Sequence, residues 1–435
     1  MLNNVNVLEM LSKWNSWDRI SVESGVPRQI TGEISNYLDS PEVIVLKGVR
    51  RSGKSTIMFQ VMNALMSRGI SSKSILYVNF EEPFFAEHRR PDVFERLFNA
   101  YREEINPTGR VYVFLDEVQE IPMWEKWVRT KTDLKEAKIF VTGSSSKLLG
   151  TEFSTLLTGR NISFTVFPLA FREFLSFKGF DDFSDPVRLL KHKPLVKNLL
   201  REYMQFGGFP EVVLRERPEA KDKLLKQYFE DILYKDVVWR YQIRDIATLK
   251  NIALLCMANI SNLFSYNKIK NALGVPLDVV RSYSGYMGEA YLIKEVLKHS
   301  FKVKEQLRNP KKIYAVDMGL RNAVSYRFSE DLGRIAENIV AVELMRQERD
   351  IYYYKNKGEV DFLVRKGIGI ETLLQVCMTG GENEKTLQRE LDAIKEGMEN
   401  LEAKTGILIT EDLEKEFIFG KKRVTAIPLW KWLLR

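Results

Sequence analysis

The 435-residue sequence predicts an α/β fold whose N-terminal part is a parallel sheet covered by helices on both faces. Short apolar runs alternate with stretches of helical periodicity, and several of these runs end in polar or glycine-rich turns. The runs lie near Val43, Ile75, Val111, Ile139 and Ile162. Because parallel strands need long crossover connections, this alternation favours a parallel sheet over a series of hairpins.

The first apolar run, residues 43–47, leads directly into a glycine-rich loop with the pattern Gly-x-x-x-x-Gly-Lys-Ser. Its glycines allow backbone N–H groups to point inward at phosphates, while Lys54 supplies positive charge and Ser55 supplies a Mg²⁺ ligand. A helical stretch follows at residues 55–66, which is the context that this pattern requires. The predicted phosphate-binding residues are Gly48, Val49, Arg50, Arg51, Ser52, Gly53, Lys54, Ser55 and Thr56.

Two acidic residues end the apolar run at 111–115. At the carboxyl edge of a parallel sheet, Asp116 is expected to hold Mg²⁺ through water, and Glu117 to polarise the water that attacks a γ-phosphate. The run at 138–142 leads into a Gly-Ser turn, where a hydroxyl can sense the γ-phosphate. We expect Ser144 to be this sensor, with Thr142 and Ser145 as alternatives.

Three further motifs follow in the sequence: Val-Thr-Gly-Ser-Ser-Ser-Lys-Leu-Leu at 141–149, Leu-Thr-Gly-Arg at 157–160 and Phe-Pro-Leu-Ala-Phe-Arg-Glu-Phe at 167–174. Together they resemble the AAA-superfamily (P-loop) ATPases of archaea and bacteria that carry a C-terminal restriction-endonuclease-like domain. The resemblance implies ATP and Mg²⁺ as ligands. It also implies a functional role for Arg160, which would reach the γ-phosphate of its own or a neighbouring subunit, the alternative being a solvated side chain.

Changes of pattern along the chain predict five regions. Residues 1–40 are a helical lead-in, 41–170 the P-loop ATPase core and 171–245 a helical lid. Residues 246–304 form a winged-helix-like domain and 305–435 the restriction-endonuclease-like α/β domain. Helix-turn-helix spacing predicts the fourth region. The third helix of this region is expected at residues 276–287. If it enters a DNA groove, the candidate contacts are Lys268, Lys270, Asp278, Arg281, Ser282 and Tyr283. The alternative is that this region docks a protein.

The C-terminal region departs from the pattern of an active nuclease. By position, the resemblance assigns the metal-binding roles to Glu337, Asp361 and Gln375, and places Cys377 where a catalytic lysine belongs. A glutamine lacks the charge to hold a divalent ion, and a cysteine is no substitute for an ammonium group. We therefore expect a degenerate domain, unless substitutes come from elsewhere; the candidates are Glu359, Lys366 and Lys385.

The composition of the chain limits the partners and the cellular compartment that we expect. The net charge of +8, from 66 basic and 58 acidic side chains, fits either a nucleic-acid partner or a charge-dense soluble surface. Cys256 and Cys377, far apart in apolar surroundings, fit a reducing compartment. No leader pattern and no membrane-length apolar run is seen, so we expect a cytoplasmic protein that binds no membrane.

The sequence therefore predicts an ATP-binding, Mg²⁺-dependent ATPase that couples hydrolysis to a DNA or protein partner, with self-association as a further expectation. The alternatives are a nucleotide-switched binding protein with incidental hydrolysis and an ATP-regulated nuclease. Very slow hydrolysis with ATP-dependent capture of a partner would favour the first alternative, and cleavage that depends on Asp361 would favour the second.

Overall fold

The computed structural model describes residues 4–15, 17–18, 21–144, 159–181, 183, 186–325, 332–367, 369–378 and 384–435. The chain divides into two compact units, Met1–Val166 and Phe167–Arg435. Each unit has its own sheet and its own buried residues, and each is described by itself.

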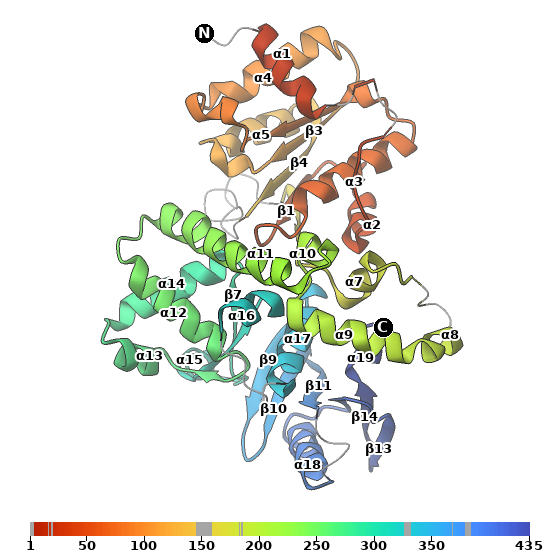
Figure 1. Ribbon diagram of the computed structural model, residues 1–435, viewed down its shortest axis with the longest axis vertical. Coiled ribbons are helices and arrows are strands. Elements are labelled where there is room, and N and C mark those ends of the chain that lie inside the picture. The colour runs from red at the N-terminus through yellow and green to blue at the C-terminus, as the bar shows by residue number, and fades with distance from the viewer. Residues whose placement is uncertain are drawn as a thin grey trace. The chain divides into compact units, whose positions relative to one another are not determined.

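The N-terminal unit contains a five-stranded parallel sheet in the order β2-β3-β4-β1-β5 (Figure 1). All five strands lie where the apolar runs predict them: β1 (Val43–Lys47), β2 (Ile75–Asn79), β3 (Val111–Asp116), β4 (Ala137–Gly143) and β5 (Asn161–Thr165). Because helices cover both faces, β1 to β4 are buried over almost their whole length, which explains why they are continuous apolar runs rather than alternating ones.

Two helical layers cover this sheet (Figure 1). On one face lie α1 (Asn4–Trp14), α4 (Asp92–Glu104) and α5 (Trp124–Asp133). On the other lie α2 (Gln29–Ser35) and α3 (Lys54–Ser67). Three short 3₁₀ turns join these elements: η1 (Ser72–Ser74), η2 (Pro83–Glu87) and η3 (Val118–Glu120). Since β1 and β3 are separated only by β4, the loops after these strands open at the same edge of the sheet.

The C-terminal unit begins with helices, as predicted for residues 171–245. They are α7 (Phe171–Phe177), α8 (Pro186–Lys191), α9 (Lys193–Phe206), α10 (Pro210–Leu214), α11 (Pro218–Asp231) and the π-helix η5 (Ile232–Trp239). A further helix, α16 (Met318–Val324), packs against α9 and α11 although it comes much later in the chain.

Three helices and a small antiparallel sheet follow. The helices are α12 (Ile246–Ala258), α13 (Tyr266–Leu273) and α14 (Leu277–Glu289), with Gly274 in the left-handed conformation between the last two. The sheet has the order β6-β8-β7, formed by Leu263–Phe264, Lys311–Ala315 and Ile293–Val296, and α15 (Val303–Arg308) lies between β7 and β8. The sequence suggested that β8 belongs to the C-terminal domain. Instead it pairs with both β6 and β7 in the small antiparallel sheet.

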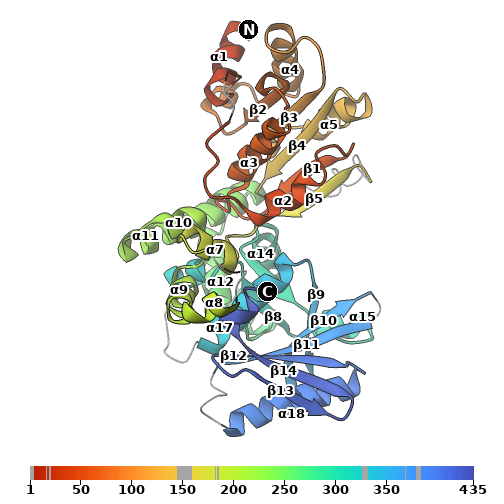
Figure 2. The same ribbon diagram turned by 90° about the vertical axis from the view of Figure 1, so that its right-hand side faces the viewer.

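The rest of the unit is a mixed six-stranded sheet in the order β13-β14-β12-β11-β10-β9. Its strands are β9 (Asp350–Lys355), β10 (Glu359–Lys366), β11 (Gly369–Cys377), β12 (Thr405–Thr410), β13 (Lys415–Phe419) and β14 (Lys422–Pro428). Figure 2 shows α18 (Glu384–Asn400) on one face and α17 (Leu332–Arg346) on the other, and α19 (Leu429–Trp432), labelled in Figure 1, packs against β12 and β14. Asp361 lies in β10, and Gln375 and Cys377 lie in β11.

Among the residues that the structure describes, no helix is both long and apolar enough to cross a membrane.

Candidate functional site

The glycine-rich loop connects the end of β1 with the start of α3. Gly48 has φ 147°, and a Cβ at this position would lie 2.1 Å from the backbone oxygen of Val166. Gly53 has φ 96° and precedes α3 without providing a side-chain cap. Because this helix starts without a capping side chain, its first N–H groups and its positive dipole end face the loop, an arrangement that attracts anions.

Lys54 is the central cation of this loop. Its side chain is only 4% exposed, and its Nζ lies 3.3 Å from the carbonyl oxygens of both Gly48 and Val49. The same Nζ lies 3.5 Å from Glu117 Oε1. The structure therefore brings together the lysine and one of the two acids that the sequence motifs predict to act on the same phosphates.

Asp116 is held by two hydroxyl groups from the neighbouring strands. Tyr77 OH on β2 donates to Asp116 Oδ2 at 2.6 Å, and Thr142 Oγ1 on β4 donates to Asp116 Oδ1. Burial raises the pKa of Asp116 and Glu117 adds to the rise, while hydrogen bonds from Ser55, Thr142 and Tyr77 oppose it. The carboxylate is thus fixed in one orientation next to Ser55, as its predicted role in holding Mg²⁺ requires.

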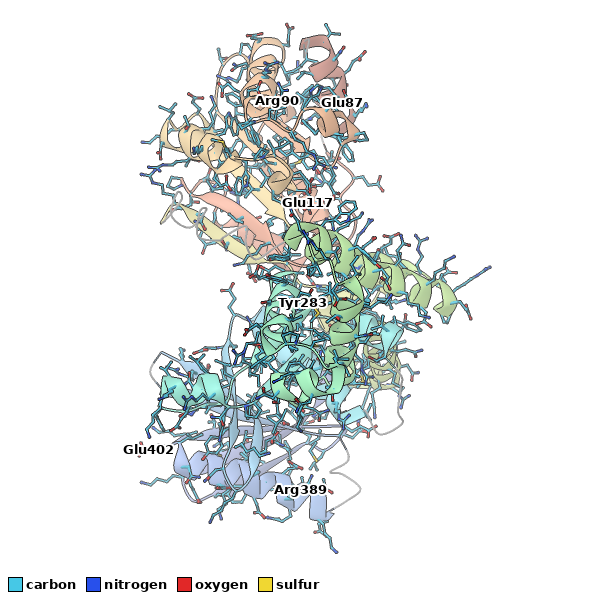
Figure 3. All side chains as sticks on the ribbon, turned by 90° about the vertical axis from the view of Figure 1, so that its left-hand side faces the viewer. Glu87, Arg90, Glu117, Tyr283, Arg389 and Glu402 are labelled. Atoms are coloured by element: carbon cyan, nitrogen blue, oxygen red, sulfur yellow. The ribbon has the colours of Figure 1, made fainter. Side chains whose placement is uncertain are left out.

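Glu117 has an unusual backbone conformation for its residue type. Its φ of 51° and ψ of 47° are left-handed, which costs a non-glycine residue of the order of 1 kcal/mol or more. Its N–H donates to Thr142 Oγ1 at 2.9 Å, and Gln119 Nε2 donates to Glu117 Oε2 at 2.6 Å. Burial raises the pKa of Glu117, but Lys54 and then Arg50 outweigh this effect, so that the net pKa is lowered. The side chain, labelled in Figure 3, is therefore an ionised carboxylate at the end of β3.

The predicted sensor residues lie at the end of β4, between the phosphate loop and the acids. Ser144 follows β4 directly and is fully buried. Thr142, the alternative, already bonds both Asp116 and the backbone of Glu117. Ser145 lies outside the described residues. Thr142 thus positions Asp116 and the backbone of Glu117, and Ser144 stays the predicted sensor.

The two loop arginines differ in their surroundings. Arg50 forms an ion pair with Glu81 at 2.7 Å, just after β2, and its side chain is 12% exposed. Arg51 is exposed, with φ 69°. Ser52 Oγ is buried, and no partner for it is found among the described residues. An orphaned buried hydroxyl inside the loop is consistent with a ligand that would complete its hydrogen bonding.

Arg160 is not brought to this site within one chain. It immediately precedes β5, whose first residue, Asn161, is in register with Val43 at the start of β1. The phosphate loop follows the other end of β1, about 13 Å away at four residues of strand rise. The guanidinium group instead forms an ion pair with Asp133 of α5, and both side chains are more than 40% exposed. Arg160 therefore lies at the end of β1 opposite to the phosphate loop of its own chain, and its role at a γ-phosphate stays a prediction.

No motif in the sequence points to three other residues of the site. Tyr77 positions Asp116, and Asn15 of the lead-in exchanges hydrogen bonds of 2.7 and 2.8 Å with the Tyr77 backbone. Arg28 NH1 donates to Ser52 O at 2.8 Å and so supports the phosphate loop from the N-terminal segment. One signal was available for Tyr77, because a tyrosine hydroxyl within an apolar strand needs a polar partner.

The acidic residues of the C-terminal unit also cluster, but around a lysine. Lys312 Nζ of β8 lies 3.0 Å from Glu337 Oε1, 3.0 Å from Glu359 Oε1 and 2.8 Å from Asp361 Oδ1. Burial lowers the pKa of Lys312, but Asp361 and the other acidic neighbours raise it well above the ordinary value. Burial and then Asp361 raise the pKa of Glu337 to about 8, against the effects of Lys312 and Tyr314.

The two residues that depart from the nuclease pattern have structural partners. Gln375 Oε1 accepts a hydrogen bond from Asp361 N at 2.9 Å, and Gln375 Nε2 donates to Glu390 Oε2 at 2.7 Å. Cys377 is buried in the apolar cluster under α18. Of the proposed substitutes, Glu359 joins the Lys312 cluster, whereas Lys366 lies at the exposed end of β10 and Lys385 near the start of α18.

The predicted DNA-contacting residues are mostly exposed, but the charges that α14 contributes are balanced. Asp278 and Arg281 of α14 lie 3.8 Å apart and neutralise each other. Lys268, Lys270 and Ser282 are exposed, and Tyr283, labelled in Figure 3, is half-buried. This helix face therefore lacks the strong basic surplus that is typical of a DNA-reading helix.

The parallel sheet, its glycine-rich loop and the acids after β3 define an AAA-type P-loop ATPase domain. Residues 40–175 match the family described as AAA domain, and residues 197–331 match a domain of unknown function. An uncharacterized protein of Methanocaldococcus jannaschii is 33% identical over 434 residues, which cover 93% of this chain and 91% of that protein. An uncharacterized protein of Haemophilus influenzae is 31% identical over 77% of this chain and 82% of its own length. The chain belongs to the family of these proteins.

Solved structures resemble the chain only loosely. The Orc1 protein of Aeropyrum pernix, solved in complex with DNA, has 13% identity and a TM-score of 0.33, covering 69% of this chain and 93% of its own. Cdc6p of Pyrobaculum aerophilum has 12% identity and a TM-score of 0.29, covering 74% of this chain and 98% of its own. At these TM-scores we draw no conclusion from the likeness.

Proposed function

We propose that the protein binds ATP with Mg²⁺ at the carboxyl edge of the N-terminal sheet and hydrolyses it. The observation that carries this proposal is the buried Lys54–Glu117 ion pair, which joins the phosphate loop to the acidic turn after β3. Lys54 here contacts loop carbonyls and a carboxylate, which are the kinds of group that phosphate oxygens would replace.

Each residue then has a defined task. The N–H groups of residues 48–56 and Lys54 would hold the phosphates, Ser55 would be a ligand of Mg²⁺, and Asp116 would hold the ion through water. When bound, Mg²⁺ neutralises charge on the phosphate oxygens. Glu117, ionised and fixed by Gln119 and the Thr142 hydroxyl, accepts a hydrogen bond from the attacking water and orients it. Ser144 is the proposed sensor of the γ-phosphate.

Lys54→Ala is expected to weaken ATP binding about 10- to 100-fold, since it removes a charged hydrogen-bond donor to phosphate. Calorimetric titration with Mg²⁺-ATP measures this. The matched control is Lys131→Ala, which removes another buried lysine of the same unit, one that pairs with Glu95 and Glu136. Equal affinities for Lys54→Ala and Lys131→Ala would rule out the proposed phosphate site.

Tyr77→Phe is expected to raise the Mg²⁺ concentration for half-maximal ATP turnover about fivefold, which corresponds to about 1 kcal/mol for one lost hydrogen bond to Asp116. The measurement is the ATPase rate against MgCl₂ concentration. Tyr101→Phe is the control. The Tyr101 hydroxyl donates to Lys73 O, which lies just before the start of β2 and so at the end of that strand away from Asp116. An unchanged Mg²⁺ requirement in Tyr77→Phe would show that Tyr77 does not position Asp116.

Coupling of hydrolysis to a DNA or protein partner is part of the same proposal. The helix-turn-helix arrangement of α13 and α14 beside a three-stranded sheet supports the proposal that residues 246–304 are a winged-helix-like docking domain. Residues 171–245 would act as the lid. Arg160 is exposed, so in a homo-oligomer its side chain would reach the γ-phosphate bound by a neighbouring subunit. A nucleotide-switched binding protein remains the alternative.

A further inference from the structure

The carboxylate cluster of the C-terminal unit is built around a buried ammonium group. Lys312 is 1% exposed and belongs to β8, in a sheet different from that of Asp361 on β10. Its Nζ lies within 3.0 Å of one oxygen each from Glu337, Glu359 and Asp361. An ammonium group has three donors, so these three carboxylates satisfy its hydrogen-bonding capacity.

An oxygen of each carboxylate in this cluster also accepts a hydrogen bond from another group. Tyr314 OH donates to Glu337 Oε1 at 2.8 Å, and Val376 N donates to Asp361 Oδ2 at 3.0 Å. Glu359 Oε2 accepts from Lys355 Nζ at 2.9 Å. A divalent ion needs several oxygens with free lone pairs at about 2.0–2.6 Å. Among the described residues, no group of three or more His, Cys, Asp or Glu side chains is arranged to hold a metal ion.

We propose that Lys312 permanently takes the place of a divalent metal in this cluster, so that the C-terminal domain does not cleave phosphodiesters. The fold resemblance assigns the metal to Glu337, Asp361 and Gln375, but the residues present do not fit it. Glu337 and Asp361 bind the Lys312 ammonium group, and Gln375 bridges the Asp361 backbone to Glu390.

The competing possibility is that Lys312 is a relocated catalytic lysine. A cavity of about 770 Å³ adjoins the cluster, and its walls include Glu359, Asp361 and Gln375. Lys312 is not among the described residues that line this cavity. A molecule in this cavity would thus meet Glu359 and Asp361 but not the Lys312 ammonium group, and the cations that it could reach on the walls are Lys357, Lys385 and Arg389. This geometry favours a structural counter-ion over a catalyst.

Removing the ammonium group tests this proposal. The full-length, nucleotide-free protein is titrated with Mn²⁺ and the free ion is counted by electron paramagnetic resonance. We expect Lys312→Ala to bind one more Mn²⁺ per chain than the wild type, and Lys312→Ala/Asp361→Asn to lose that extra ion. Lys355→Ala, which removes the exposed lysine on Glu359, should match the wild type. No gain in Lys312→Ala would overturn the proposal.

A second measurement covers the case in which Lys312→Ala does not fold. The wild type is then compared with Glu359→Gln, which changes the most exposed carboxylate of the cluster, 31% exposed against 9% for Asp361. We expect equal Mn²⁺ binding and no Mn²⁺-dependent cleavage of DNA by either protein. A Mn²⁺ site lost in Glu359→Gln, or cleavage by the wild type, would show that the cluster is a metal site after all.

Discussion

Glu117→Gln is expected to lower the rate of ATP hydrolysis about 10²- to 10⁴-fold, the range for loss of a general base. The amide keeps the size of the side chain but cannot accept a proton from water. ATP binding should persist, because Lys54 then loses its carboxylate partner at 3.5 Å and becomes more available to phosphate. Phosphate release and ATP affinity, measured on the same preparation, separate the two effects.

The control for this variant is Glu120→Gln. Glu120 lies three residues further along the chain in η3 and pairs with Arg89 at 3.1 Å. Its loss should leave turnover within about twofold of the wild type, as expected for a partly exposed ion pair. If Glu117→Gln retains normal turnover, Glu117 does not act on the attacking water.

Gly319→Ala should destabilise the C-terminal unit by about 3 kcal/mol or more, although alanine is the better helix former. Gly319 lies in α16, and a Cβ there would come within 2.1 Å of Phe206 O and 2.9 Å of Asp317 Oδ1. Asp317 cannot readily move, since it accepts hydrogen bonds from Gly208 N at 2.7 Å and Leu320 N at 3.2 Å. Both neighbours are thus fixed.

Gly285→Ala is the matched control, since Gly285 lies in the middle of α14 and a Cβ there would have no other described atom within 4 Å, outside its own helical turn. That substitution should stabilise the protein by about 0.5–1 kcal/mol through helix propensity alone. Calorimetric unfolding of both variants measures the difference. Shifts of the same sign for the two glycines would contradict the close packing of α16 against the end of α9.

The N-terminal sheet could be predicted from sequence because each of its strands is a continuous apolar run ending in a distinctive turn. Lys54, Asp116 and Glu117 followed from the same local patterns. The position of Arg160 could not be predicted in this way, because a motif fixes neighbours along the chain but not the edge of the sheet at which they lie. Tyr77 and Arg28 were missed because their partners are 39 and 24 residues away.

The C-terminal unit was harder to predict for a related reason. Glu337 and Asp361 were correctly grouped from the order of helix and strands. Lys312, however, belongs to a strand that pairs outside the six-stranded sheet, so nothing in its local sequence indicated that it would lie between these acids. The hydrophobic periodicity of a segment predicts its own secondary structure but not its contacts with a strand of another sheet.

The most direct test of the central claim is release of inorganic phosphate from ATP by the purified full-length chain, with Mg²⁺ and with a chelator in its place. We predict release with Mg²⁺ that stops when the ion is removed, since Ser55 and Asp116 are the residues proposed to hold it next to the phosphates. No release in Mg²⁺, or release that continues in the chelator, would contradict a metal-dependent ATPase site at the edge of this sheet.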